Sequence, residues 1–167
     1  MTESDDQNSF LDRMLRHLPG FGGYVEHKTR QRSEQQMREF VVAELEKTKS
    51  AIDIFAKGQV EKGIIDNAAK CEQLRDSIDN ISQRLTSRLP DANSFFGAAL
   101  IDEEKLEGLY DCEASIMDQV AELTDLAIIL DHKPDEPINA LAEMGVMVTA
   151  LQQQTAGRER LLSELGD

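Results

Sequence analysis

The chain has 167 residues, enough for one domain with a hydrophobic core that needs neither metal nor disulfide bonds. Aromatic residues make up 5% and tryptophan is absent, a composition typical of long amphipathic helices. The net charge of −14 is concentrated in residues 90–167, which hold 4 Lys and Arg against 17 Asp and Glu. Because nucleic-acid binding requires a basic face, this distribution argues against it as the main function.

The beginning of the chain, "MTESDDQNSF", is acidic and polar, whereas a secretory signal begins with positive charge before an apolar core. No run of apolar residues approaches the roughly 18 residues of a membrane-spanning helix. We therefore expect a cytoplasmic protein.

The first predicted element is a short amphipathic helix over about residues 4–18. Its apolar stripe consists of Phe10, Leu11, Met14, Leu15 and Leu18. The proline and glycines of "PGFGG" end this helix and form a hinge, with Phe21 and Tyr24 as hydrophobic anchors. We divide the chain into an N-terminal arm and hinge (1–24) and a helical bundle domain (25–167), with the glycines serving to detach the arm.

Two long helices follow, over about 26–57 and 60–89. The first has seam positions spaced by three and four residues: Met37, Val41, Leu45 (or Glu44), Thr48, Ile52 and Phe55. The second repeats the pattern with Val60, Ile64, Cys71, Leu74, Ile78, Ile81 and Leu85. The step of five from Phe55 to Val60 breaks the register. With Gly58 as the helix end, this break favours a hairpin over one continuous rod.

Two further helices are predicted over about 102–131 and 135–165. Asp102 is the expected N-cap of the first, and Ile101 and Leu106 form its hydrophobic staple. The seams of the two helices are Leu106, Leu109, Glu113, Ile116, Val120, Leu123, Ala127 and Leu130, then Leu141, Met144, Val148, Leu151, Thr155, Arg158, Leu162 and Leu165. Four long helices joined by short links predict an all-α, antiparallel, up-down-up-down bundle.

Cofactor chemistry receives little support from the sequence. A di-iron centre needs Glu-x-x-His motifs, and none of His17, His27 and His132 has a glutamate three positions before it. Oxygen ligands are dense in "DEEKLEG" and "DCE", but a solvated acidic face is favoured over a Mg²⁺ or Ca²⁺ site. Cys71 and Cys112 lack the spacing of a metal or redox motif and are interpreted as reduced packing residues. We predict no cofactor, no metal and no catalytic residue.

Glu113 and Arg158 are candidate buried polar residues because both occupy seam positions. The favoured interpretation rotates the helix slightly, so that Glu113 lies at the margin of the seam and Tyr110 or Cys112 points inward. A buried polar pair that fixes helix register comes second, and a ligand site comes last.

Positive charge gathers where the second helix begins, although it opposes the helix dipole there. The cluster comprises Lys28, Arg30, Arg32 and Arg38. The acidic second half of the same chain is the favoured counterpart. The acidic half of another subunit and an anionic lipid surface remain alternatives.

Two segments carry a resemblance to a known family: "LPGFGGYVEHKTRQR" and "IDEEKLEGLYDCEASIMDQV". They resemble a family of uncharacterised bacterial helical proteins that share a short leading helix, a Pro-Gly-aromatic-Gly-Tyr joint, a basic helix start and a Leu-x-x-Leu-Tyr element. The resemblance covers about a fifth of the chain and implies no activity, substrate or cofactor.

Taken together, these patterns favour a non-enzymatic helical-bundle interaction or scaffold protein. It would dock on a protein partner, or on a second copy in a homo-oligomer, through the arm and the basic cluster. The alternative is a peripheral membrane protein that inserts Phe10, Met14, Leu15 and Phe21 into the interface. A carboxylate-based metal-binding bundle ranks third.

Overall fold

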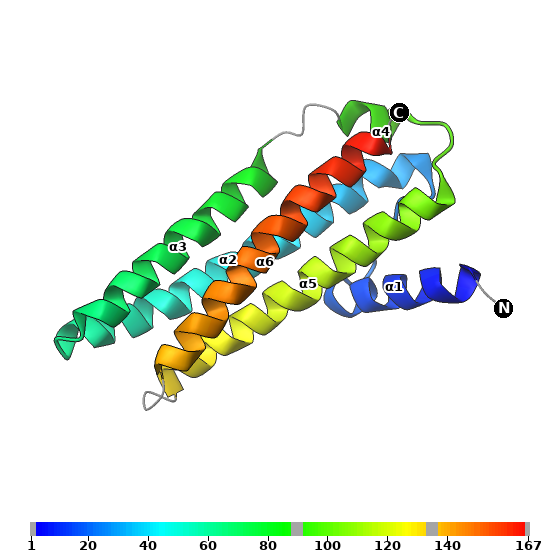
Figure 1. Cartoon of the computed structure of the whole chain (residues 1–167). Helices are drawn as coiled ribbons and strands as arrows, with labels where there is room; N and C mark the ends of the chain where they lie inside the picture. Colours follow the sequence, from blue (N-terminus) through cyan, green and yellow to red (C-terminus); the bar gives the residue numbers. More distant parts are fainter. Residues whose placement is uncertain (1–2, 88–91, 133–136, 166–167) are drawn as a thin grey trace.

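In a computed structural model, the backbone is described for residues 3–87, 92–132 and 137–165, and side chains for 10–87, 95–130, 132 and 139–165. Helix accounts for 87% of the described residues, and none of them lies in a strand. The helices are α1 (Glu3–His17), α2 (His27–Glu61), α3 (Ile65–Thr86), α4 (Ala92–Gly97), α5 (Glu103–His132) and α6 (Pro137–Glu164). The all-α bundle that the sequence predicts is confirmed (Figure 1).

The four long helices form the sides of the bundle in the order α2, α3, α6, α5, and each packs against the next (Figure 1). The hairpins α2–α3 and α5–α6 are each antiparallel, as expected. Between the hairpins the helices run parallel. Tyr24, just before α2, meets Glu113 of α5, and Thr48 meets Thr124 further along the same two helices.

The connection between α3 and α5 is not the short link that the sequence predicts. Because α5 packs beside α2, it lies diagonally across the bundle from α3, and the chain must cross the end of the bundle between them. The crossing contains α4, which packs against α2 and α6 and buries Phe95. At its end, the Asp102 carboxylate accepts a hydrogen bond of 3.2 Å from the Lys105 amide, as expected of an N-cap.

The turn between α2 and α3 confirms the hairpin, but it lies later than expected. Helix α2 continues through Gly58 to Glu61, and the reversal occurs at Gly63, which has φ of +75°. Of Gly58 and Gly63, only Gly63 adopts the left-handed conformation that ends a helix readily. Val60 and Ile64 are consequently exposed and do not belong to the core, contrary to the predicted seam.

The hydrophobic core otherwise follows the predicted seams. All the remaining seam positions of the four long helices are buried, including the polar members Thr48, Glu113, Thr155 and Arg158. Cys71 is buried and Cys112 is partly buried, and both are free cysteines. The core therefore runs the length of the bundle and contains charge near one end.

Candidate functional site

The predicted arm, α1, packs along the outer side of α5 (Figure 1). Met14 is fully buried, whereas Phe10, Leu11 and Leu18 are partly buried against the core. Leu15 is 39% exposed. Apart from Leu15, the apolar stripe of the arm thus packs against the arm's own bundle in this structure.

Ion pairs supplement this apolar contact. Arg13 donates hydrogen bonds of 3.0 and 2.7 Å to one oxygen of Asp118, and His17 Nε2 lies 2.8 Å from the other oxygen. Partial burial alone would raise the pKa of Asp118, but the hydrogen bonds from His17 and Arg13 outweigh it and hold that pKa below its usual range. Asp118 was not anticipated from the sequence, because a carboxylate on the outer side of a predicted helix carries no distinguishing signal.

The joint between α1 and α2, residues 19–24, does not detach the arm at Gly23, contrary to the sequence-based interpretation. Gly23 has φ of +71°, and a Cβ atom there would lie 2.6 Å from the hydroxyl of Tyr110. Tyr110 in turn accepts a 2.7 Å hydrogen bond from the Tyr24 amide. Glycine is required at this position so that the backbone can lie directly on α5. Gly20, by contrast, has φ of +83° and open space around it.

Tyr24 anchors the joint inside the bundle. Its ring is fully buried, stacks on Tyr110 and meets Phe21 and Phe95 edge-on. Its hydroxyl donates a 2.6 Å hydrogen bond to Glu113. Burial raises the pKa of Tyr24 well above its ordinary value, and the charge of Glu113 adds to the effect, so the hydroxyl remains a donor.

Glu113 and Arg158 form a buried pair, with exposed fractions of 0% and 1%. The favoured margin position of Glu113 is therefore wrong: Tyr110 also points inward, but Glu113 does so with it. Arg158 donates from Nε to Glu113 at 2.8 Å and from Nη2 to Glu34 at 3.0 Å. Arg38 donates to the same oxygen of Glu34 at 2.7 Å. We call Tyr24, Glu34, Arg38, Glu113 and Arg158 the buried charge network; Arg38, at its edge, is partly exposed.

Glu34 is a member of the network that the sequence analysis missed. It lies three residues before Met37 and so extends the seam of α2 by one step towards its N-terminus, which is the signal that could have identified it. Two carboxylates and two guanidinium groups balance the charge of the network. Burial raises the pKa of Glu113, against the influence of Arg158 and Tyr24. Burial would lower the pKa of Arg158, but the two glutamates outweigh it and raise that pKa, so the guanidinium stays charged.

Among the described residues, no side chain of the basic cluster forms an ion pair with an Asp or Glu of residues 90–167, contrary to the favoured interpretation. Arg30 is buried and donates to backbone carbonyl oxygens of Tyr24 at 2.7 Å and Ala98 at 2.5 Å, which fastens the joint to the segment after α4. Arg38 contacts Glu34 and the carbonyl of Leu85. Lys28 and Arg32 lie at the surface, and Lys28 Nζ is 3.4 Å from a carboxylate oxygen of Glu26.

The described residues contain no group of three or more His, Cys, Asp or Glu side chains placed to hold a metal ion. No helix within the described ranges is long and apolar enough to cross a membrane. No protein-family model matches the chain, and no curated protein and no solved structure matches it. The resemblance to uncharacterised bacterial proteins remains a prediction.

Proposed function

We propose that the protein is a non-enzymatic interaction protein that binds a protein partner through α1, which serves as a releasable latch on α5. The observation that carries this proposal is the contrast between the two ends of the joint. Tyr24 and Arg30 are buried and hydrogen-bonded within the bundle, whereas α1 rests on the outer side of α5, with His17 at its end also packed against Phe40 of α2. Gly20, in open space between them, provides a pivot.

The energies support release of α1 without loss of the bundle. Partly exposed ion pairs such as Arg13–Asp118 contribute about 0–1 kcal/mol each. Burial of a side chain such as Met14 contributes about 1.5–3 kcal/mol, and the partly buried Phe10, Leu11 and Leu18 each contribute a fraction of that. A cost of several kcal/mol leaves a small open population that a partner with a comparable apolar groove could capture. Unfolding a whole domain typically requires about 5–15 kcal/mol.

The buried charge network supports binding over catalysis. Each of its charged side chains forms a hydrogen bond with another side chain of the network, and the Tyr24 hydroxyl donates a hydrogen bond to Glu113. A catalytic carboxylate would need a free face towards a substrate. The network instead connects the joint to α2, α5 and α6, and so holds the fixed end of the latch.

The test uses a chain that lacks residues 1–18 and retains Phe21 and Tyr24. We expect it to unfold cooperatively by circular dichroism and to bind a labelled synthetic peptide of residues 1–18, measured by fluorescence anisotropy. The same peptide with Met14→Asp is the matched control and should bind at least tenfold more weakly. If the truncated chain does not unfold cooperatively, α1 is a core helix and the latch proposal fails.

A second arm of the test identifies the class of partner. The variant Asp118→Asn removes the ion-pair anchor of α1 and should capture more of a specific protein from source-cell extract than the unaltered chain does. The truncated chain should capture none of it. If the full chain instead sediments with anionic vesicles and the truncated chain does not, the membrane-surface alternative replaces this proposal.

A further inference from the structure

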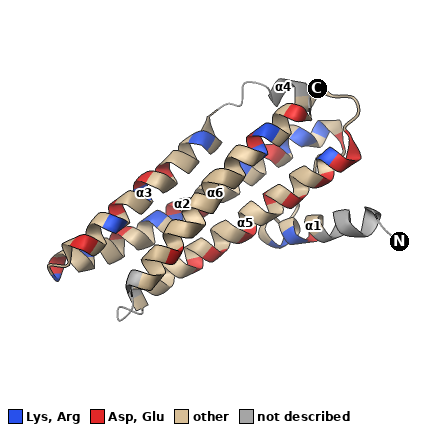
Figure 2. Ribbon diagram, viewed as in Figure 1, with Lys and Arg blue, Asp and Glu red and all other residues tan. Residues whose placement is uncertain are grey.

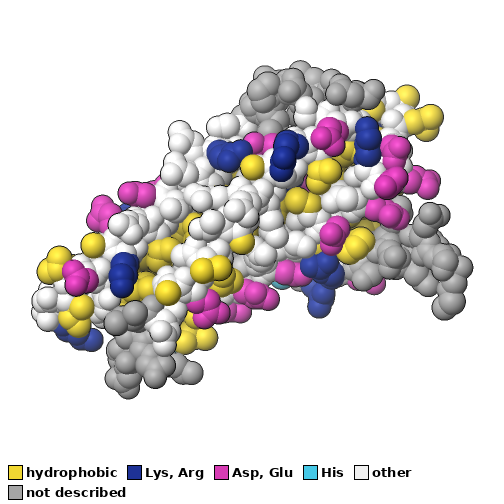
Figure 3. Space-filling view, viewed as in Figure 1, with side chains coloured by type: hydrophobic (Ala, Val, Ile, Leu, Met, Phe, Trp, Pro, Cys, Tyr) yellow, Lys and Arg dark blue, Asp and Glu magenta, His cyan; other side chains and the backbone are white. Residues whose placement is uncertain are grey.

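A groove of about 350 Å³ opens between α3 and α6, on a different pair of helices from those that hold α1. Its lining includes the apolar side chains Leu74, Leu141 and Val148. Further along the same pair of helices, Arg84 of α3 and Glu159 of α6 form an ion pair of 2.7 Å. Figure 3 shows hydrophobic side chains at the surface between these helices.

The part of α6 beside the groove is uncharged over an unusual length. Residues 144–157 include no Asp, Glu, Lys or Arg in a chain that is 30% charged, and Figure 2 shows this part of α6 as a continuous tan ribbon. Val146 projects from it with 72% of its surface exposed. Gly145, beside Val146, has nothing within 4 Å of the position of a Cβ atom. A protruding aliphatic side chain therefore lies next to a hollow whose lining is partly apolar.

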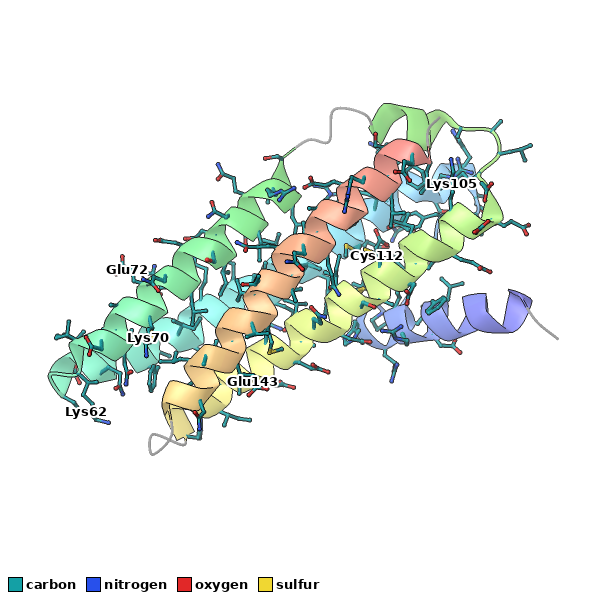
Figure 4. The ribbon with its side chains drawn as sticks, viewed as in Figure 1. Lys62, Lys70, Glu72, Lys105, Cys112 and Glu143 are labelled. Atoms are coloured by element: carbon teal, nitrogen blue, oxygen red, sulfur yellow. The ribbon has the colours of Figure 1, made fainter. Side chains whose placement is uncertain are left out.

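Opposite charges border this face. Lys70 of α3 lines the groove on one side. Glu143 follows Ala142 by one residue, a rotation of about 100° that carries it to the side of α6 turned away from α3. Both side chains are exposed, and neither forms an ion pair among the described residues (Figure 4). Because α3 and α6 run parallel, with Arg84 level with Glu159, Lys70 and Glu143 lie at nearly the same height along the bundle.

We infer that this face binds a second copy of the chain, with a two-fold axis running along the bundle between the two α6 helices. A symmetric dimer uses the same patch on both copies, so the patch must be complementary to itself. Rotation about an axis parallel to α6 exchanges the two borders of the face and preserves height. Lys70 of each copy then faces Glu143 of the other, and Val146 of each copy faces the other's groove.

The charge distribution selects this partner and this axis. Two copies of charge −14 repel each other wherever acidic surfaces meet, and the uncharged stretch of α6 lets them approach without that cost. A two-fold axis perpendicular to α6 would place like borders together, with the lysine edges facing each other. The parallel axis instead pairs opposite charges at both edges. This inference concerns a surface away from α1 and does not depend on the latch.

The first test measures mass against protein concentration by sedimentation equilibrium. We expect a dimer for the unaltered chain and at least tenfold weaker association for Val146→Arg, since a guanidinium would enter a groove that already holds Lys70. Ile54→Arg is the matched control: Ile54 is 60% exposed on α2, away from the groove, and its replacement should leave association unchanged. A monomer at all concentrations, or equal association of both variants, would overturn the inference.

The second test checks the axis by charge reversal. Lys70→Glu and Glu143→Lys should each weaken the dimer, and the combined variant should restore it, because the two positions meet across the interface. Failure of the combined variant to restore association would overturn the proposed axis. The chain lacking residues 1–18 should dimerise as the full chain does. Loss of the dimer in that truncated chain would assign self-association to α1 and overturn the α3–α6 interface.

Discussion

Replacing Arg158 by methionine tests whether the buried charge network supports the fold. Arg158 is the guanidinium shared by Glu113 and Glu34, and all three side chains are buried. Its loss leaves an uncompensated buried carboxylate, which typically costs about 3–5 kcal/mol. Tyr24 still donates to Glu113, and Arg38 still donates to Glu34, so we expect a loss of stability near 3 kcal/mol.

The measurement is urea unfolding followed by circular dichroism at neutral pH. Arg84→Met is the matched control, because Arg84 is half-exposed and paired with Glu159 at the surface. Its stability should fall by no more than about 1 kcal/mol. Adding Glu113→Gln to Arg158→Met should cause little further loss, since it removes the orphaned charge. If Arg158→Met costs no more than the control, the network makes no net contribution and the reasoning is refuted.

The same variant has a predicted pH dependence. Burial raises the pKa of Glu113, and without Arg158 the main opposing charge is gone, so that pKa should rise further. A carboxyl whose folded pKa lies above its unfolded value contributes stability below the unfolded pKa, and this is lost as pH rises through the folded pKa. The deficit of Arg158→Met relative to the unaltered chain should therefore be smaller near pH 4.5, about the unfolded glutamate pKa, than near pH 8. An equal deficit at both pH values would contradict this.

Three further predictions concern the joint between α1 and α2, the proposed latch α1, and the end of α2. Gly23→Ala should cost about 2–4 kcal/mol in urea unfolding, since it combines left-handed strain with a clash at the Tyr110 hydroxyl, whereas Gly20→Ala should cost about 1–2 kcal/mol from strain alone. Asp118→Asn should accelerate amide hydrogen exchange in α1 but not in α2. In the unaltered chain, because the pKa of Asp118 is lowered, the stabilisation of α1 should be lost only as pH falls through that folded pKa. Gly58→Ala should stabilise the protein by about 0.5–1 kcal/mol, because the position lies within α2 and nothing lies within 4 Å of the position of a Cβ atom there. A destabilised variant would place the end of α2 earlier.

The sequence predicted the helices and their buried faces well because helical spacing is a local property. The steps of three and four from Met37 to Phe55 are visible in one short segment, and each of those side chains is buried. Helix ends were less certain. In the sequence, Gly58 and Gly63 are equally able to end a helix; the positive φ of Gly63 and the hydrogen bonds after α2 distinguish them.

The candidate site was predicted only in part. Seam spacing identified Glu113 and Arg158 as exceptions within apolar seams, but it could not establish whether they were buried or paired. Their partners lie far away along the chain: Glu34 is 124 residues from Arg158, and Tyr24 is 89 residues from Glu113. The role of Gly23 was misjudged for the same reason, since its close neighbour is a tyrosine of α5.

The sequence by itself determined that this protein is a helical bundle and which face of each long helix is buried, because periodicity encodes both. Only the tertiary structure decided that α5 packs beside α2 and not beside α3. That arrangement brings Tyr24, Glu34, Glu113 and Arg158 together at one level. It also requires the connection between α3 and α5 to cross the end of the bundle. It also leaves α3 and α6 to border a groove. A helical period carries no information about which neighbour a buried face will meet, and that choice depends on packing and charge pairing between segments distant in the chain.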